Sequence, residues 1–171
     1  MTDFETILRK SIGEDLSAND VIELFPGKLI FKLYEELYKY DRLEDVFDGH
    51  EGLVILYQFT KYQGHFILLT KRPESIEVFD SLAMPPDGEL KLFPYNKDPI
   101  LSTLIRRYKG KTVINTYKFQ RDTDKVTTCG RHCLVRFAFR EFNLAQFTDF
   151  IKSANMPYDR LVTMMSLIIK H

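Results

Sequence analysis

Several residue types and segments that place a chain in a special class are rare or missing from this sequence. Its 171 residues include two cysteines, eight glycines, seven prolines and no tryptophan, and no long apolar run is present. The sequence therefore argues against a scaffold held by several disulfides and against a membrane-spanning helix. No repeat, signal peptide or linker rich in Gly, Pro and Ser is visible, so we expect one reduced, soluble, intracellular domain over residues 1–171.

An excess of charge of either sign is also lacking. The 24 Lys and Arg residues balance 24 Asp and Glu residues, which argues against a strongly cationic surface for nucleic acid. One local basic run, residues 106–111, remains. A helix that begins at Pro99 and ends at Gly110 would carry these cations at its C-terminal end, where the helix dipole favours them. We favour this interpretation of the run over contact with nucleic acid.

Hydrophobic periodicity predicts helices at both ends of the chain and strands between them. The expected helices cover residues 3–12, 17–24, 29–40, 99–110, 129–142, 144–154 and 158–170. The expected strands cover residues 53–59, 65–70, 75–79 and 113–119. Helices packed around a central mixed sheet give an α+β fold, with an N-terminal helical segment of about residues 1–48 before a core of about residues 49–171.

Two of these strand-like runs predict that a histidine and an aspartate meet. Residues 65–70 and 75–80 flank a four-residue turn, and a hairpin that pairs them end to end sets His65 opposite Asp80 on one face. A slip of one residue would move Asp80 to the other face. The same register pairs Leu69 with Ile76 and Ile67 with Val78. A cross-strand His and Asp pair is often only structural, because a buried histidine needs a hydrogen-bond partner.

A cysteine at the expected start of a helix is the candidate nucleophile. Cys129 follows Thr128 and precedes a long apolar stretch without Gly or Pro. Unpaired backbone N–H groups and the helix dipole stabilise a thiolate at such a position, and a neighbouring imidazolium adds to this. Gly130, which has no side chain, would let a substrate backbone pass close to the sulfur.

The second cysteine lies one helical turn further on. Cys133 would be deeper in the helix, where a free cysteine behaves as a small apolar residue, so we favour Cys129 as the nucleophile. Adjacent turns of one helix are poorly placed for an unstrained disulfide. A zinc site of Cys129, His132 and Cys133 lacks the usual spaced ligand pairs and would need a distant fourth ligand such as His50. We therefore expect no metal, and we expect His132 on the helix surface.

With these residues in view, the chain resembles the cysteine proteases of the adenain and SUMO-protease superfamily, whose triad runs His, Asp or Glu, then Cys. The resemblance rests on Gly64-His65-Phe66, on Val78-Phe79-Asp80-Ser81-Leu82 and on Thr128-Cys129-Gly130-Arg131-His132-Cys133. It implies the fold of that superfamily, a central mixed sheet packed by helices with the nucleophile at a helix N-terminus. It also implies that Cys129 attacks, that His65 is the base and then the acid, and that Asp80 orients the imidazole.

The resemblance implies further site residues and also marks departures. Gln120, with the backbone N–H of Cys129, would supply the oxyanion hole, although it lies nine residues before Cys129 rather than six or seven. Phe66 stands where relatives commonly carry Trp, so it and Gly130 would form a substrate-binding wall whose selectivity for Gly-Gly is in doubt. Thr128 replaces the Asp of many deSUMOylating enzymes, which favours the viral maturation branch.

The implied function is a cysteine endopeptidase that processes capsid or other virion precursor proteins and acts in the virion and in the host cytoplasm or nucleus. Its partner would be a polypeptide substrate, with no cofactor, no membrane and no metal. An activating peptide or nucleic acid is suggested only by the use of DNA in adenovirus protease. The alternatives are an isopeptidase specific for ubiquitin-like proteins, an acetyltransferase with the same triad, and a binding protein without catalysis.

Overall fold

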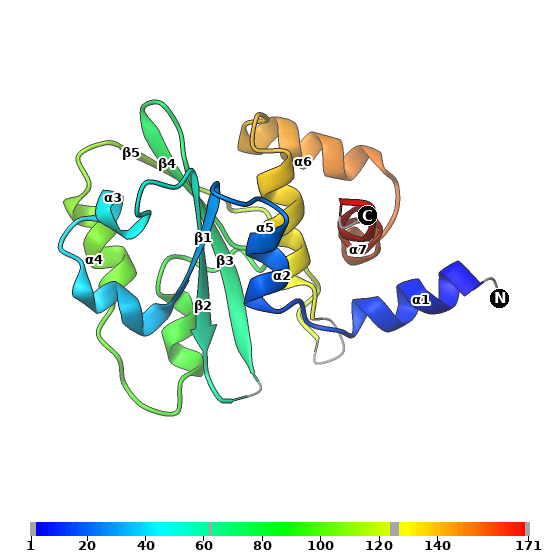
Figure 1. Cartoon of the computed structure of the whole chain (residues 1–171), viewed down its shortest axis with the longest axis horizontal. Coiled ribbons are helices and arrows are strands. Elements are labelled where there is room, and N and C mark those ends of the chain that lie inside the picture. The colour runs from blue at the N-terminus through cyan, green and yellow to red at the C-terminus, as the bar shows by residue number, and fades with distance from the viewer. Residues whose placement is uncertain (1–2, 62, 124–126, 170–171) are drawn as a thin grey trace.

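A five-stranded mixed sheet forms the centre of the molecule (Figure 1). The computed structural model describes residues 3–61, 63–123 and 127–169. The strands lie side by side in chain order and comprise β1 (Leu29–Leu33), β2 (Gly52–Gln58), β3 (Gly64–Lys71), β4 (Ser75–Phe79) and β5 (Lys111–Ile114). β1 runs parallel to β2 and β4 runs parallel to β5, whereas β3 is antiparallel to both of its neighbours.

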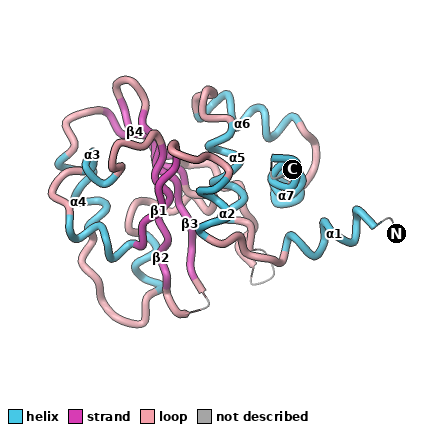
Figure 2. Tube along the Cα trace, viewed as in Figure 1, coloured by secondary structure: helices cyan, strands magenta, loops and turns pink. Residues whose placement is uncertain are grey.

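Helices cover both faces of this sheet (Figures 1 and 2). On one side lie α2 (Ala18–Glu23), α5 (Cys129–Ala138), α6 (Leu144–Ser153) and α7 (Tyr158–Ile169), and α1 (Asp3–Ile12) reaches away from the sheet and packs on α7. On the other side lie α3 (Leu43–Val46), α4 (Ile100–Arg107) and the 3₁₀ helices η1 (Tyr34–Lys39) and η2 (Gly88–Leu92). The expected α+β class, with helices around a central mixed sheet, is confirmed. Among the described residues no helix is long and apolar enough to cross a membrane.

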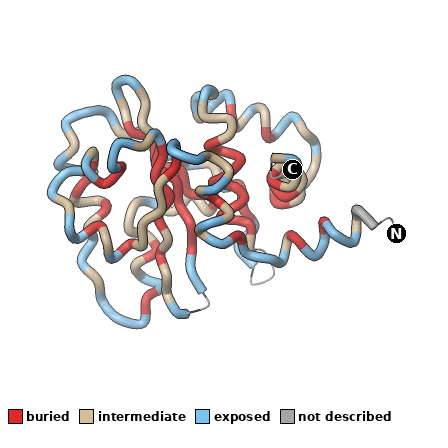
Figure 3. The backbone as a smooth tube through the Cα atoms, in the orientation of Figure 1, coloured by how far each residue is buried: buried red, intermediate tan, exposed pale blue. Residues whose placement is uncertain are grey.

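The sheet separates two hydrophobic cores because its central strands are buried on both faces (Figure 3). On β3, Phe66 and Leu68 face the core under α5, whereas Ile67 and Leu69 face the core under η1, α3 and α4. A strand with alternate residues in two cores reads as a continuous apolar run, as residues 66–69 do. Burial on both faces thus holds β3, and the histidine near its start, in place.

The pairing of β3 with β4 differs from the expected register by two residues. Leu69 lies opposite Val78 rather than Ile76, because the strands continue to the pair Lys71 and Ile76. Arg72 N–H donates to the Ser75 carbonyl at 2.8 Å, so the turn has two central residues instead of four. The expected end-to-end pairing was therefore wrong, but a shift of two keeps every side chain on its face because the side-chain period of a strand is two.

Residues 29–40 were expected to be helical, and this expectation was wrong. They form β1 and then η1, so the N-terminal segment of about residues 1–48 contains an edge strand of the sheet. The aromatic residues of this run are spaced as in a helix, but Leu29–Leu33 forms a full ladder of hydrogen bonds with β2 that the local pattern does not predict.

Three predicted elements end earlier in the structure. β5 ends at Ile114, five residues before the predicted end at 119. α4 ends at Arg107 and α5 at Ala138, earlier than predicted.

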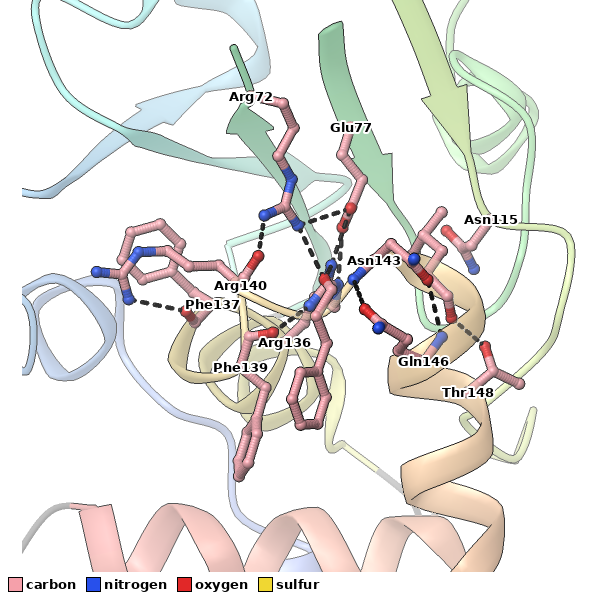
Figure 4. Close-up of polar contacts among 12 residues, drawn as sticks. Arg72, Glu77, Asn115, Arg136, Phe137, Phe139, Arg140, Asn143, Gln146 and Thr148 are labelled. Atoms are coloured by element: carbon pink, nitrogen blue, oxygen red, sulfur yellow. Dashed lines mark hydrogen bonds and ion pairs between the residues drawn. The ribbon is translucent and has the colours of Figure 1, made fainter. Parts of the chain in front are cut away.

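A buried ion-pair network joins α5 to the β3–β4 hairpin (Figure 4). The guanidinium of Arg136, which has no exposed surface, donates from Nε to Glu77 Oε1 at 2.7 Å and from Nη2 to Glu77 Oε2 at 2.8 Å. Arg72 donates to the same carboxylate at 2.8 Å. The Phe139 and Phe142 carbonyls accept the remaining Arg136 donors, at 2.8 and 2.7 Å. Because these buried charges are well partnered, the network ties the helix that carries Cys129 to the central sheet.

We expect replacement of Arg136 by Met to lower the free energy of unfolding by about 3–5 kcal/mol, because Glu77 would keep a buried charge without its main partner. Chemical denaturation measures this loss. Arg140→Met is the matched control, since Arg140 pairs with the half-exposed Glu51, and it should cost about 1 kcal/mol or less. Equal losses in the two variants would contradict the assignment of a buried network.

Candidate active site

The structure brings His65 and Asp80 together. His65 lies at the start of β3 and Asp80 follows the last residue of β4, so the observed register makes them diagonal rather than opposite neighbours. His65 Nε2 and Asp80 Oδ1 are 2.8 Å apart, and the side chains are 5% and 3% exposed. The pairing of a buried imidazole with a buried carboxylate is therefore present despite the shift in register.

Asp80 is held by neighbours that the sequence did not reveal. Asn115, just after β5, accepts from the Asp80 backbone N–H through Oδ1 at 2.8 Å and donates through Nδ2 to the Asp80 carbonyl at 2.7 Å. The Leu82 N–H donates to Asp80 Oδ1 at 2.8 Å. These bonds fix both the backbone and the carboxylate, so Asp80 can orient the imidazole ring of His65.

Cys129 is the first residue of α5, as predicted, and its side chain lies close enough to His65 to raise the pKa of the imidazole. Asp80 engages Nε2 of the same ring. Thr128, which precedes the helix, donates from Oγ1 to Asp159 Oδ1 at 2.6 Å, and its carbonyl accepts from the His132 N–H at 2.9 Å. His65, Asp80 and Cys129 thus lie together, with a hydrogen bond between His65 and Asp80 and an electrostatic interaction between His65 and Cys129.

The electrostatics of these three residues favour a charged imidazole. Burial by itself lowers the pKa of His65, but hydrogen bonds to Asp80 and Cys129, together with their charges, outweigh it and raise the pKa to about 10. Burial raises the pKa of Asp80, yet the hydrogen bond and charge of His65 outweigh it and hold the pKa below its ordinary value. A charged imidazole that is held by a carboxylate beside a cysteine is an arrangement that activates a cysteine nucleophile.

Asp159 on α7 ties together the segment before Cys129. Its carboxylate accepts from Thr128, from His132 Nε2 at 3.1 Å and from the N–H and Nε of Arg121, both at 3.2 Å. Burial raises the pKa of Asp159, but the bonds from His132 and Thr128 outweigh it and lower the pKa. The expectation of His132 on the helix surface was wrong, because its ring is 1% exposed and points at Asp159.

Cys133 is fully buried, and its thiol donates to the Phe66 carbonyl at 3.6 Å. Burial raises the pKa of this thiol well above its ordinary value. Both cysteines are free, so no disulfide links them. The structure therefore separates the two sulfurs by environment: that of Cys129 contacts the imidazole, and that of Cys133 packs in the core.

Gln120 lies beside Cys129 and is tied to the residue after Asp80. Ser81 Oγ donates to Gln120 Oε1 at 2.7 Å, which directs the amide nitrogen away from Ser81. The Ser81 carbonyl accepts from the N–H groups of Phe119 and Gln120, at 2.8 and 2.9 Å. The longer connection from Gln120 to Cys129 includes residues 124–126, which lie outside the described residues. Ser81 thus couples the position of Gln120 to that of Asp80.

A cavity opens over the sulfur and continues on its other side. The first part, about 290 Å³, is lined by His65, Gln120 and Cys129 among others. The second, about 200 Å³, is lined by Phe66, Leu16 and Cys129. Asp15, Gln63 and Gly64 line both parts. Cys129 therefore lies where an extended chain could pass across it, walled on one side by the α1–α2 connection.

Phe66 and Gly130 lie against each other beside the sulfur. A Cβ at Gly130 would point to Leu16 and Phe66, each about 3.4 Å away, so this side of the glycine faces protein rather than substrate. Phe66 is 7% exposed and reaches the second part of the cavity. Their roles in substrate binding stay predictions.

The sequence did not single out Glu89, which joins the dyad. Ligand atoms of His65, Asp80 and Glu89 all lie within 4.8 Å of one another, and this is the group of possible metal ligands among the described residues. We interpret it as a proton-sharing network, because Nε2 of His65 is engaged by Asp80. No local pattern marks Glu89 in the sequence, since only the fold brings η2 to the dyad.

No protein-family model matches the chain. A protein of Sputnik virophage, described as uncharacterized protein V9, is 32% identical over 164 residues, which cover 89% of this chain and 94% of that protein. The chain belongs to the family of this virophage protein. Membership of this family leaves the activity open.

Solved structures share part of the architecture. ChlaDub1 of Chlamydia trachomatis is 13% identical with a TM-score of 0.47, over 99% of this chain and 77% of that chain. The central domain of Lpg1148 from Legionella pneumophila is 15% identical with a TM-score of 0.43, over 92% and 97%. The C. trachomatis effector Cdu1, solved bound to ubiquitin, is 13% identical with a TM-score of 0.43, over 97% and 77%. Likeness at this level decides neither a family nor an activity.

We expect His65 to titrate with a pKa of about 10 in an NMR experiment on the free protein. Because this pKa lies above the ordinary 6.5, charged His65 contributes stability that is fully present below pH 6.5 and lost as the pH rises through about 10. Asp80→Asn should lower the pKa, whereas Cys133→Ala, which leaves these contacts of His65 intact, should not. A His65 that titrates near 6.5 would contradict the described geometry.

Proposed function

We propose that this protein is a cysteine protease in which Cys129 is the nucleophile, His65 the base and acid, and Asp80 the residue that orients His65. The observation that carries the proposal is that one buried imidazole bonds a carboxylate and lines the same cavity as a helix N-terminal thiol, which raises the pKa of the imidazole. The sulfur also lines a cavity, so a substrate can reach it. A purely structural histidine needs neither the thiol nor the opening.

The geometry supports acyl transfer in two steps. The Cys129 sulfur attacks the carbonyl carbon of the scissile peptide, the C–N bond breaks, and His65 gives its proton to the leaving amine. Water then attacks the thioester carbon, His65 takes the water proton, and the sulfur leaves as a thiolate. In each step the negative oxygen would be stabilised by the Cys129 N–H and the Gln120 amide. Asp80 keeps the imidazole oriented and stabilises its charged form.

The proposed substrate is a precursor of a virion protein, cleaved next to small residues. Two observations support this choice. The chain belongs to a family with a virophage member, and the cavity on the Phe66 side is small, about 200 Å³, with Leu16 and Phe66 in its lining. A ubiquitin-like protein with a Gly-Gly end would use the same passage, so the experiment below compares both substrates.

Replacement of Cys129 by Ala should lower cleavage by about 10⁴-fold or more, because no other group can form the thioester. The assay incubates the protein with virion precursors from the same genome and maps new termini by mass spectrometry. A ubiquitin-like probe with an electrophilic C-terminus is tested in parallel. Cys133→Ala is the matched control and should keep activity, since its thiol packs in the core.

Each outcome of this assay decides between substrates or between functions. Cleavage of precursors without probe labelling supports the maturation protease, and efficient labelling at Cys129 supports an isopeptidase instead. Absence of cleavage, of labelling and of reaction with small thiol-directed electrophiles at Cys129 would point to a binding protein without catalysis. Loss of activity in Cys133→Ala alone would overturn the choice of nucleophile.

Replacement of Gln120 by Ala should lower kcat by roughly 10²–10³-fold with little change in KM, because the amide is expected to act on the oxyanion that forms in the transition state. Gln63→Ala is the control, since Gln63 lines the same cavity and is not expected to contact the oxyanion. Steady-state kinetics on a cleaved peptide separates the two parameters. A change in KM alone for Gln120→Ala would assign that residue to substrate binding.

A further inference from the structure

Glu89 is a buried carboxyl group next to the catalytic dyad. It lies in the first turn of η2 and is 1% exposed. A carboxyl group in such a place must be either partnered by a donor or uncharged, because an isolated buried carboxylate is strongly disfavoured. No Lys or Arg stands among the charges that act on Glu89, which are those of Asp80 and His65.

The hydrogen bonds that the described residues make around Asp80 leave one of its two carboxyl oxygens without a donor. Its Oδ1 accepts from His65 Nε2 and from the Leu82 N–H, both at 2.8 Å. Its Oδ2 and the Oε2 of Glu89 are both buried, and among the described residues neither has a conventional hydrogen-bond donor. Carboxyl oxygens of Asp80 and Glu89 nonetheless lie within 4.8 Å of each other, and interaction with Asp80 raises the pKa of Glu89. Two ionised carboxylates would repel at this separation, whereas one proton between them satisfies both orphaned oxygens.

We propose that Glu89 is held as a neutral carboxylic acid that donates its proton to Asp80 Oδ2, and that it is thereby a positioning residue for the dyad. The part of this inference that concerns catalysis rests on the proposed protease function. The proton stays on Glu89, so no co-reactant is needed. With Oδ2 bonded to Glu89, the Asp80 carboxyl cannot rotate, and Oδ1 stays directed at His65.

The electrostatic environment of Glu89 agrees with a neutral acid at physiological pH. Burial is the largest cause that raises the pKa of Glu89, and the hydrogen bond and charge of Asp80 raise it further. The charge of His65 lowers it, and the pKa is about 9. The charges of Glu89 and Asp87 raise the pKa of Tyr57, which lies on β2. Asp87 is itself partnered by the Tyr34 hydroxyl at 2.7 Å and the Ser102 N–H at 2.7 Å. The groups that face Glu89 from the packed elements are thus His65, Asp80, Tyr57 and Asp87.

If Glu89 positions Asp80, two substitutions of Glu89 should differ in kcat. A purely structural role would give no such difference. Glu89→Gln keeps a neutral donor for Asp80 Oδ2, so kcat at pH 7 should stay within about threefold of wild type. Glu89→Leu removes the donor and leaves Oδ2 buried and unpaired, so kcat should fall about tenfold or more while KM stays unchanged. Glu141→Gln, a change at an exposed glutamate, is the control and should behave as wild type.

Infrared spectroscopy tests the protonation state without any substrate. The wild-type protein at pH 7 should show the C=O stretch of a protonated carboxyl group, and this band should vanish in Glu89→Gln and persist in Glu141→Gln. It should also disappear as the pH rises through about 9, where Glu89 ionises. At that pH wild-type kcat should decline, and in Glu89→Gln this decline should be missing, so activity should persist until His65 titrates at about 10.

The outcomes distinguish this inference from the proposed function. Absence of the infrared band, or equal damage in Glu89→Gln and Glu89→Leu with both folded by circular dichroism, would overturn the role of Glu89. A band that behaves as expected in a protein that cleaves nothing would uphold the shared proton and reject the protease function and, with it, the positioning role in catalysis. A band together with the expected difference in kcat would support both.

Discussion

The arrangement of the molecule around Cys129 depends on one buried imidazole that bonds the Asp80 carboxylate and interacts with the Cys129 thiol. This arrangement requires the end of β4, the start of β3 and the start of α5 to meet. Burial of β3 in two cores positions the histidine, and the Asn115 side chain positions Asp80 from β5. Asp159 positions the segment before Cys129 from α7. Much of the fold therefore serves to hold three small groups at fixed distances.

The protein handles buried charge in two different ways. Glu77 lies between the guanidinium groups of Arg136 and Arg72, so its charge is fully partnered and its role is to join α5 to the sheet. In the part of the chain that the structure describes, the carboxyl groups of Asp80 and Glu89 each have a buried oxygen without a hydrogen-bond donor. One proton shared between the two groups is the simplest way to give both oxygens a partner. A fully partnered charge rigidifies a structure, whereas a carboxyl pair with one proton also responds to pH. A carboxyl pair that shares one proton is therefore suited to a catalytic site.

Local patterns predicted most elements of the fold and the three residues of the site. The helix at residues 3–12 and the helix that starts at Cys129 depend on neighbours in the chain, so their signals are in the sequence. The predicted register of β3 and β4 was wrong by two residues, because the apolar pairing that supported it is equally well satisfied after a shift of two. The edge strand β1 was missed because its ladder with β2 is formed by residues more than twenty positions away.

The sequence by itself determined the period of β3 and β4 and the start of α5, and hence which face His65 and Asp80 share and where Cys129 lies in its helix, because these follow from backbone geometry over a few residues. The tertiary structure alone decided what surrounds them. Asn115, Ser81, Asp159 and Glu89 carry no local signal, and His132 was misplaced for the same reason. Their positions depend on which distant segments pack together, and that depends on the burial of two whole cores rather than on any short pattern.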